Sequence, residues 1–250
     1  MGRDDEGLEG AVAIVTGAAG GIGSAVVEEL CDAGASVVAE DLEAAVDELA
    51  SDRVAPLQGD AADASTARAA VELAVSRFGR LDVVVNNAGR FLLKPIVDTT
   101  DDEWDGLMTT NVRSVFVHCR EALPQLIASD RGAIVNVSSI SGVVGLPAQG
   151  AYGATKGAIA QITRQLAIEH AADGVRVNAI APGAVDTSFV DKAVGGPPDP
   201  QRNEEIAAAH PLGRMATPEE IARMMVFLAS PASGFTTGAV VMADGGYTAR

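Results

Sequence analysis

Tyr152 and Lys156 are the side chains of this sequence best suited to proton transfer. They stand four residues apart, and the helical period of Ile159, Ile162 and Leu166 after them places both on one helix face. An unperturbed tyrosine, with a pKa of about 10, is a poor base at neutral pH. A nearby ammonium stabilises the phenolate, so the pair predicts a phenol that exchanges a proton with a substrate oxygen. The plainer interpretation is the start of an ordinary amphipathic helix.

Two serines and an asparagine add polar groups to this set. Ser138 and Ser139 end an apolar run, where hydroxyls reach the ligand edge of a parallel sheet. Asn111 falls within an apolar stripe made of Trp104, Leu107, Met108, Val112, Val115, Phe116 and Cys119. Its amide needs hydrogen-bond partners if it is buried. A core asparagine satisfied by the backbone is the plainer interpretation, and it is compatible with a functional one.

A glycine-rich turn, Thr16-Gly17-Ala18-Ala19-Gly20-Gly21-Ile22-Gly23, links the first apolar run to a helical period. Glycines let the backbone approach a pyrophosphate, whose charge is met by free amides and the positive end of the helix. Such a turn alone is weak evidence. The strand before it, the helix after it and an acidic residue farther on predict a dinucleotide site. The residues expected there are Gly17, Gly20, Gly21, Ile22 and Gly23.

The acidic residue is Asp41, which ends the second apolar run. A carboxylate there accepts both hydroxyls of the adenosine ribose and repels the 2′-phosphate of NADP. Neither Gly20 nor Leu42 offers a guanidinium for such a phosphate. NAD is therefore favoured over NADP. The plainer interpretation is a solvated strand end, because Glu40 and Glu43 are also acidic.

Short β-branched runs alternate with longer segments of helical period, which predicts a parallel sheet with helices on both faces. The fold expected is α/β, a single-domain doubly wound Rossmann fold. The predicted strands are Ala11 to Thr16, Ser36 to Glu40, Val54 to Leu57, Leu81 to Val85, Ala133 to Val137, Val175 to Ile180 and Ala239 to Met242.

The organisation expected is a flexible N-terminus over residues 1–10 and one catalytic domain over residues 11–250. A substrate loop is expected at about residues 184–211. Its most irregular part, Val194 to Asn203, is rich in glycine and proline and is predicted to be a mobile loop.

The sequence resembles the short-chain dehydrogenase/reductase family from Ala11 to Tyr247. The matching pieces are Thr16-Gly17-xxx-Gly21-Ile22-Gly23, Asn86-Asn87-Ala88-Gly89, Asn111, Ser138-Ser139, Tyr152-xxx-Lys156 and Pro182-Gly183. The resemblance implies that Ser139 orients the carbonyl or hydroxyl of the substrate and that Ser138 only satisfies the backbone. It also implies that Asn111 holds a water that relays protons through Lys156.

Further cofactor contacts follow from the resemblance, although loop chemistry alone is the plainer interpretation of most of them. Asn87, Ala88 and Gly89 are implied to wall the adenosine half, and Asp60, followed by Ala61, to meet the adenine amino group. Pro182, Gly183, Val185 and Thr187 match the segment that holds the nicotinamide carboxamide. Tyr152 and Lys156 also contact the cofactor. A homotetramer is implied, with packing through the helices at roughly 101–127 and 152–171.

The formal net charge of −16 argues against nucleic acid or an anionic membrane surface as a partner. Cys31 and Cys119 lack metal-like spacing and are expected to be buried thiols in a reducing compartment. No metal is expected. The first ten residues lack the features of a secretory signal, and no apolar run reaches the length of a membrane span. Cytoplasmic residence is therefore expected.

The loops expected to shape the substrate pocket are apolar, with Val143, Val144, Leu146, Phe189 and Val190, and Gln149 offers one polar contact. Arg90, Lys94 and Lys192 are basic groups that neighbouring loops could bring in. The function expected is NAD-dependent interconversion of a small, largely apolar secondary alcohol and a ketone.

Two alternatives stay open. One is an NADPH-dependent 3-oxoacyl-thioester reductase, which the acidic composition fits poorly because the acyl carrier is itself acidic. The other is a non-catalytic relative that senses NAD, which has no physical need for Asn111, Ser139, Tyr152 and Lys156 together.

Overall fold

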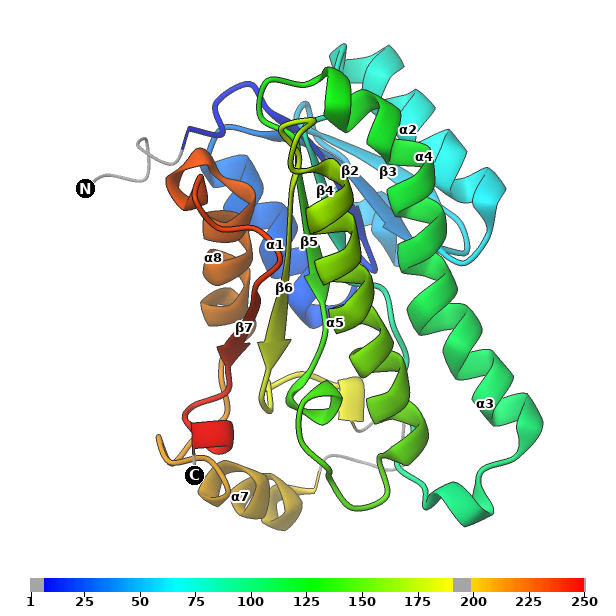
Figure 1. Cartoon of the computed structure of the whole chain (residues 1–250), viewed down its shortest axis with the longest axis vertical. Coiled ribbons are helices and arrows are strands. Elements are labelled where there is room, and N and C mark those ends of the chain that lie inside the picture. Colours follow the sequence, from blue (N-terminus) through cyan, green and yellow to red (C-terminus); the bar gives the residue numbers. More distant parts are fainter. Residues whose placement is uncertain (1–6, 191–198, 250) are drawn as a thin grey trace.

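The computed structural model describes residues 7–190 and 199–249, and one seven-stranded sheet runs through their centre (Figure 1). The strand order is β3-β2-β1-β4-β5-β6-β7, and all neighbouring strands are parallel. Each predicted strand is confirmed with its ends within two residues. The strands are β1 (Val12–Thr16), β2 (Ser36–Asp41), β3 (Val54–Gln58), β4 (Val83–Asn86), β5 (Ala133–Val137), β6 (Arg176–Pro182) and β7 (Val240–Ala243).

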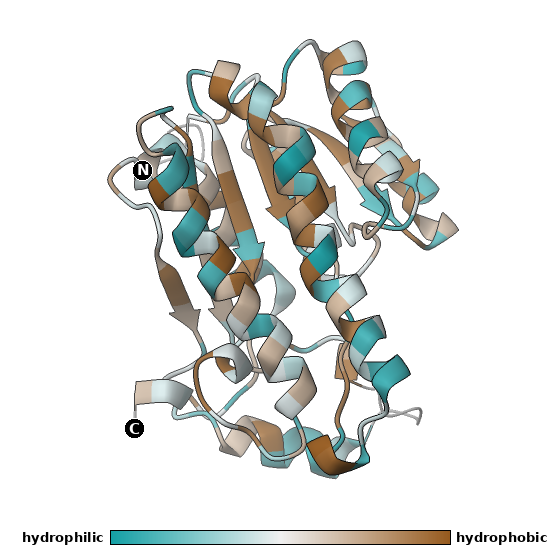
Figure 2. Cartoon of the chain, turned by 45° about the vertical axis from the view of Figure 1, so that its right-hand side comes forward, coloured by the Kyte–Doolittle hydropathy of each residue, from teal (hydrophilic) through white to brown (hydrophobic). Residues whose placement is uncertain are grey.

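Helices cover both faces of the sheet, which confirms the doubly wound, single-domain arrangement. Figure 1 shows α1 and α8 on one side of the sheet, and α2, α4 and α5 on the other. The helices are α1 (Gly21–Asp32), α2 (Ala64–Phe78), α3 (Asp101–Leu107), α4 (Ser114–Ala128), α5 (Gly150–His170), α7 (Pro200–Ala208) and α8 (Pro218–Ala229). Figure 2 shows that these helices carry mixed hydrophilic and hydrophobic residues, while the strands between them are mainly hydrophobic.

Side-chain caps define where several helices begin. The Thr100 hydroxyl accepts from the backbone of Glu103, whose carboxylate accepts from the backbone of Thr100, and α3 starts there. Thr217 and Glu220 form the same reciprocal pair at the start of α8. The Asp63 carboxylate caps α2. Each cap satisfies backbone amides that have no partner inside the helix.

Consecutive strand residues enter opposite halves of the core. Ile14 packs with the helices α2, α4 and α5, whereas Val15 packs with α1 and α8, and both are fully buried. Because both faces of a parallel strand are covered, its sequence is continuously apolar. Val83, Val84 and Val85 are buried for this reason.

The strand order reverses beside β1, which has β2 on one side and β4 on the other. Loops leaving the carboxyl ends of β1 and β4 therefore diverge to opposite faces and leave a crevice between them. The glycine-rich turn follows β1, and Asn87 follows β4. This crevice is where the predicted cofactor residues gather.

The structure refines one prediction of local structure and corrects another. The helix expected at 101–127 is interrupted by a wider π-helical segment, Met108–Arg113, which joins α3 to α4. In the predicted mobile loop Val194 to Asn203, residues 194–198 lie outside the described residues, and Pro200 to Asn203 belong to α7. The helix starts there because the Asp199 carboxylate accepts two backbone N–H groups and Pro200 suits a first helical position.

The predicted flexible N-terminus remains a prediction. Residues 1–6 lie outside the described residues, and Leu8 in the remaining part is buried. Across residues 7–190 and 199–249, no helix combines the length and the apolar character needed to cross a membrane.

Candidate active site

The glycine-rich turn leaves backbone amides free at the start of α1. Gly17 has a φ of +67°, and a Cβ there would lie 2.9 Å from the Cα of Ala88. A Cβ on Gly23 would overlap the carbonyl of Gly17, so the first turn of α1 packs directly on the loop. Gly20, the N-cap, has no side chain to bond the free N–H groups. The turn therefore suits an anionic phosphate group at the helix N-terminus.

Asp41 lies at the carboxyl end of β2, beside this turn. One carboxylate oxygen accepts from the backbone N–H of Ala19 at 2.9 Å, and the other accepts from Glu43 at 3.0 Å. Leu42 next to it is exposed. At this end, the cavity lining within the described residues is Asp41, Leu42, Glu43, Asp60 and Ala61, which include no basic group.

Asn87 ties the ends of β1 and β4 together. Its side-chain amide donates to the carbonyls of Thr16 and Gly17, both at 3.0 Å. The Thr16 hydroxyl accepts from the backbone N–H groups of Asn87 and Ala88. The crevice between the two strands is thus held by hydrogen bonds from both sides.

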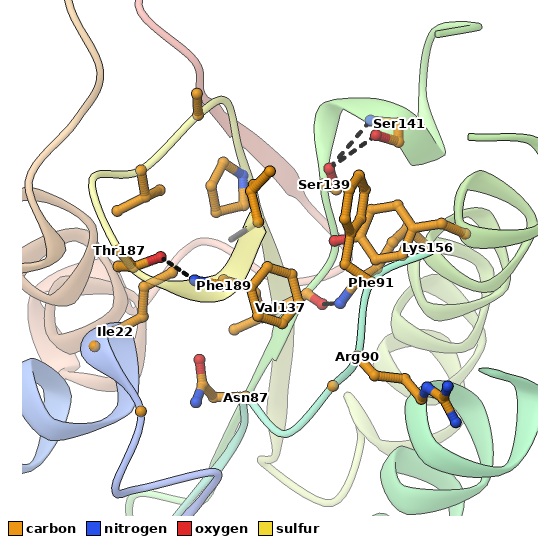
Figure 3. A pocket seen from close by; sticks show the side chains of 18 of the residues that line it. Ile22, Asn87, Arg90, Phe91, Val137, Ser139, Ser141, Lys156, Thr187 and Phe189 are labelled. Carbon is orange, nitrogen blue, oxygen red and sulfur yellow. Dashed lines mark hydrogen bonds between the residues drawn. The ribbon is translucent and has the colours of Figure 1, made fainter. Parts of the chain in front are cut away.

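One cavity of about 840 Å³ joins these groups to the residues after β5 and β6. It is lined by every residue predicted to bind the cofactor: Gly17, Gly20, Gly21, Ile22, Gly23, Asp41, Leu42, Asp60, Ala61, Asn87, Ala88, Gly89, Tyr152, Lys156, Pro182, Gly183, Val185 and Thr187. Ser139 also lines it, whereas Asn111 lies behind it. Figure 3 shows Ile22, Asn87 and Thr187 on one side and Ser139 and Lys156 on the other.

Tyr152 and Ser139 both line this cavity. Tyr152 lies in the first turn of α5, Ser139 is the second residue after β5, and both are buried. Burial raises the pKa of Tyr152 above its ordinary value, and the nearby Ser139 hydroxyl lowers it in part. This is opposite to the lowered pKa expected from the sequence. Ser138, as the resemblance implied, uses its hydroxyl on a backbone group, the carbonyl of Lys156.

Lys156 lies beneath the tyrosine. Its ammonium donates to the carbonyl of Val137 at 2.7 Å and lies 5.6 Å from the centre of the Tyr152 ring. Burial lowers the pKa of Lys156 to about 8. Because the ammonium bonds Val137 and not the phenol, burial dominates the pKa of Tyr152 in this structure.

Asn111 lies fully buried within the π-helical segment. Its oxygen accepts from the N–H of Arg90 at 2.8 Å, and its nitrogen donates to the Arg90 carbonyl and the Thr155 hydroxyl. Both atoms of the amide are therefore bonded, the oxygen through one of its two lone pairs, and the side chain links the loop after β4 to α5. π-helical turns often occur at functional sites.

The substrate end of the cavity is mainly aromatic and aliphatic. Phe91 lies edge-on to Tyr152 with ring centres 4.7 Å apart, and Phe189 is 6.1 Å beyond it (Figure 3). Of the predicted substrate residues, Leu146, Gln149, Phe189 and Val190 line the cavity, while Val143 and Val144 do not.

Of the basic groups considered for this end, Arg90 lines the cavity, whereas Lys94 is paired elsewhere. The Arg90 guanidinium lies near Gly106 of α3, and Lys94 pairs with Glu103 at 2.9 Å. Lys192 lies outside the described residues.

Comparisons with known proteins agree with this geometry. Residues 17–248 match the family model described as enoyl-(acyl carrier protein) reductase. The chain is 40% identical over 245 residues to the cis-4-hydroxycyclohexanecarboxylate dehydrogenase of Sinomonas cyclohexanicum, covering 95% of this chain and 96% of that protein. It is 37% identical over 247 residues to the 3-oxoacyl-[acyl-carrier-protein] reductase of Thermotoga maritima, covering 96% and 98%.

A solved structure from Brucella melitensis, titled a short-chain dehydrogenase/reductase of the glucose/ribitol dehydrogenase type, superposes with a TM-score of 0.88. It shares 36% identity, and the match covers 96% of this chain and 97% of the other. The chain belongs to the short-chain dehydrogenase/reductase family. As a member, it is an oxidoreductase that acts on CH–OH groups with a nicotinamide cofactor.

Sequence reasoning missed several groups of this short-chain dehydrogenase/reductase site. Thr155 stands inside the Tyr152-xxx-Lys156 motif, and its bond with Asn111 could have been suspected from that position. Phe91 follows the Asn87-Ala88-Gly89 motif at a distance of two residues, which would place an aromatic ring near the site. The role of the Val137 carbonyl could not be predicted from the sequence, because every residue type has a backbone carbonyl oxygen.

Proposed function

We propose that this chain is an NAD-dependent oxidoreductase that interconverts a secondary alcohol and a ketone, with Tyr152 as general acid and base. The observation that carries the proposal is that Tyr152 and Ser139 line the same cavity as the glycine-rich turn. Hydroxyls that hold a substrate oxygen and a helix N-terminus that holds a phosphate are thereby parts of one site.

Ser139 and Tyr152 hold the substrate oxygen, and the nicotinamide ring, when bound, accepts or supplies the hydride. In ketone reduction, the Tyr152 hydroxyl donates its proton to the carbonyl oxygen. The raised pKa of Tyr152 keeps this proton on the phenol before reaction. In alcohol oxidation, the phenol must first lose its proton, which the positive charge of Lys156 favours.

Lys156 and Asn111 return the proton to solvent. A Cβ on Gly89 would lie 3.4 Å from the Asn111 oxygen and 3.7 Å from the Lys156 nitrogen, so both polar groups border the same small space. A water between polar groups at such a place bridges them. Lys156, with its pKa of about 8, is able to pass a proton near neutral pH.

NAD is preferred because of Asp41. Its carboxylate borders the ribose end of the cavity, where the described lining has no arginine or lysine. A second negative charge, the 2′-phosphate of NADP, is repelled there.

The substrate is a small, largely apolar alcohol or ketone. Phe91, Leu146 and Phe189 offer apolar contacts beside Tyr152, and Gln149 offers one polar contact. The Sinomonas relative is named for a hydroxycyclohexane carboxylate, so alicyclic alcohols belong in the first test.

The second candidate is an NADPH-dependent 3-oxoacyl-thioester reductase. It is favoured by the Thermotoga relative, which is named for this activity. Asp41 argues against it, since NADPH would bring its phosphate to a carboxylate.

A homotetramer in the cytoplasm completes the proposal. Exposed apolar side chains on α4 and α5, Phe116 and Ile168, supply surface for subunit contacts. Cys31 and Cys119 are free thiols, which suits a reducing compartment.

The test is a spectrophotometric screen of cyclohexanols, polyols, simple secondary alcohols, the matching ketones and a 3-oxoacyl thioester, each with both cofactors. Binding of NADH and NADPH is measured separately by fluorescence. Turnover of an alcohol with NAD supports the proposal. Turnover of the thioester with NADPH alone would replace it by the second candidate, and absence of binding of either cofactor would overturn both.

A further inference from the structure

His210 is a buried histidine that joins the substrate end of the cavity to the segment after β6. It is the second residue after α7, and only 5% of it is exposed. Its Nδ1 lies 2.7 Å from the carbonyl oxygen of Ile206, and its Nε2 lies 3.1 Å from the backbone nitrogen of Ala184. Both ring nitrogens are therefore engaged with the backbone, one on each side of the ring.

These two partners fix the state of the ring. A carbonyl oxygen only accepts a hydrogen bond, so Nδ1 carries a hydrogen. The backbone N–H of Ala184 only donates, so Nε2 presents its lone pair. His210 is thus held as a neutral imidazole with its hydrogen on Nδ1. The two hydrogen bonds can form together only in this tautomer.

Gly183 is shaped to receive this ring. A Cβ on Gly183 would lie 2.7 Å from the His210 Nε2 and 3.0 Å from the Cα of Asp244. The ring therefore rests directly on the backbone that links Pro182 to Ala184. The ring of Tyr247 lies on it as well, with centres 5.2 Å apart. Asp244 does not compete for the ring, because Gly246 and Thr248 donate hydrogen bonds to its carboxylate.

The other side of the contact belongs to α7. Ile206 and His210 both line the cavity, and α7 lies at the lower end of the molecule in Figure 1, beyond the carboxyl ends of β6 and β7. The ring thus connects a helix at the substrate end to the segment Pro182 to Val185, whose backbone lines the same cavity.

We propose that His210 is a positioning residue, whose neutral ring holds the Gly183–Ala184 backbone in the position that binds the nicotinamide end of the cofactor. The inference rests on the proposed function, because it takes Pro182 to Thr187 as the cofactor segment. The acceptor at Nε2 is the decisive group: it sets the direction of the Ala184 N–H, whereas the donor at Nδ1 only anchors the ring to α7.

A matched pair of variants separates these two bonds. His210→Gln can place its amide oxygen where Nε2 lies and keep the acceptor for Ala184. His210→Asn can place its amide nitrogen where Nδ1 lies and keep only the donor to Ile206. Each variant loses the ring and one hydrogen bond. If His210 merely filled the core, the two substitutions would therefore weaken NADH binding equally.

NADH binding is measured by fluorescence titration, with thermal unfolding alongside. Because the Ala184 N–H then has no acceptor to hold the Gly183–Ala184 backbone in its binding position, His210→Asn should weaken NADH binding roughly tenfold or more. His210→Gln should stay within about threefold of the wild type. In assays with a substrate that the wild type converts, His210→Asn should raise the KM for NADH more than the KM for the substrate. Equal NADH binding by the two variants would overturn the inference.

A second measurement does not depend on a variant that folds. The sequence has three histidines, so ¹⁵N-labelled histidine gives few ring signals. The His210 signals should show hydrogen on Nδ1 and none on Nε2, and they should shift when NADH is added. His170, which pairs with Asp173 at the end of α5, serves as the control that should not shift. The opposite tautomer, or no shift of His210, would also overturn the inference.

The two failures are distinguishable. A wild-type protein that binds neither NADH nor NADPH would overturn the proposed function, and the inference with it. A wild-type protein that binds NADH, with no difference between His210→Asn and His210→Gln, would overturn the inference alone.

Discussion

The ammonium of Lys156 donates a 2.7 Å hydrogen bond to the carbonyl of Val137, the last residue of β5. The bond fastens the first turns of α5 to the edge of the sheet, and with them Tyr152. It does so with a buried charge, because only 3% of Lys156 is exposed. Desolvation of that charge is what lowers the pKa of Lys156 to about 8.

Lys156→Met should change how stability depends on pH. The pKa of this lysine is lowered from 10.5 to about 8 in the folded chain, so the unfolded chain binds the extra proton between these values. The free energy of unfolding of the wild type therefore increases as the pH rises from about 8 to about 10.5. At about 1.4 kcal/mol per pKa unit, the full gain is slightly more than about 3 kcal/mol. The methionine variant lacks this gain.

The measurement is urea unfolding of both proteins at several pH values from 8 upward, compared as a difference. Lys94→Met is the control, because Lys94 is a partly exposed lysine paired with Glu103. Its difference from the wild type should stay nearly constant with pH. A constant difference for Lys156→Met as well would show that the buried ammonium costs the fold nothing.

Tyr152→Phe should abolish most turnover without loss of the cofactor. The variant removes one hydroxyl and keeps the ring that lies edge-on to Phe91. Loss of a general acid and base lowers kcat by roughly a hundredfold to ten thousandfold. NADH binding, followed by fluorescence, should be nearly unchanged. Substantial remaining turnover would remove Tyr152 from its proposed role.

Asp41→Asn should shift the cofactor preference towards NADP. Asparagine keeps an oxygen for the Ala19 N–H but loses the charge and the acceptor for the Glu43 N–H, whereas Asp41→Ala loses all three. The ratio of NADPH to NADH affinity should rise roughly tenfold or more in the asparagine variant, because a charged hydrogen bond is worth about 1.5–3 kcal/mol. Asp47→Asn, at an exposed position of the following 3₁₀ helix, controls for net charge. An unchanged ratio in Asp41→Asn would show that another residue selects the cofactor.

Patterns of residue type predicted the sheet and the location of the site well. A buried parallel strand must be continuously apolar, and so Val83 to Val85 identified β4. The ligand edge of the sheet then followed, because all seven strands end in the same direction.

Tertiary contacts decided what sequence reasoning did not find. The π-helical turn at Asn111 depends on the backbone of Arg90, which no helical period encodes. The start of α7 was hidden by the prolines and glycines before it. The direction in which the pKa of Tyr152 shifts depends on burial and on the partner of the Lys156 ammonium. The four-residue spacing of Tyr152 and Lys156 predicts neither.

Glu40 and His118 form a buried pair that lies outside the proposed chemistry. The His118 Nε2 lies 2.8 Å from one Glu40 oxygen, and its Nδ1 lies 3.0 Å from the Ser114 carbonyl. Both side chains are almost completely buried. Since Nδ1 must carry a hydrogen to bond a carbonyl, and a hydrogen must also lie between Nε2 and Glu40, the pair retains a proton inside the core.

Removing one partner should therefore cost far more than removing both. His118→Leu leaves the Glu40 carboxyl buried without its partner, and Glu40→Leu does the same to the imidazole. Each should lower the free energy of unfolding by about 3–5 kcal/mol. The double variant buries two apolar side chains and should lose much less than the sum of the two losses. Urea unfolding of the four proteins measures the coupling. Simple addition of the two losses would mean that the pair contributes only packing, and that the proton between Glu40 and His118 has no part in holding β2 against α4.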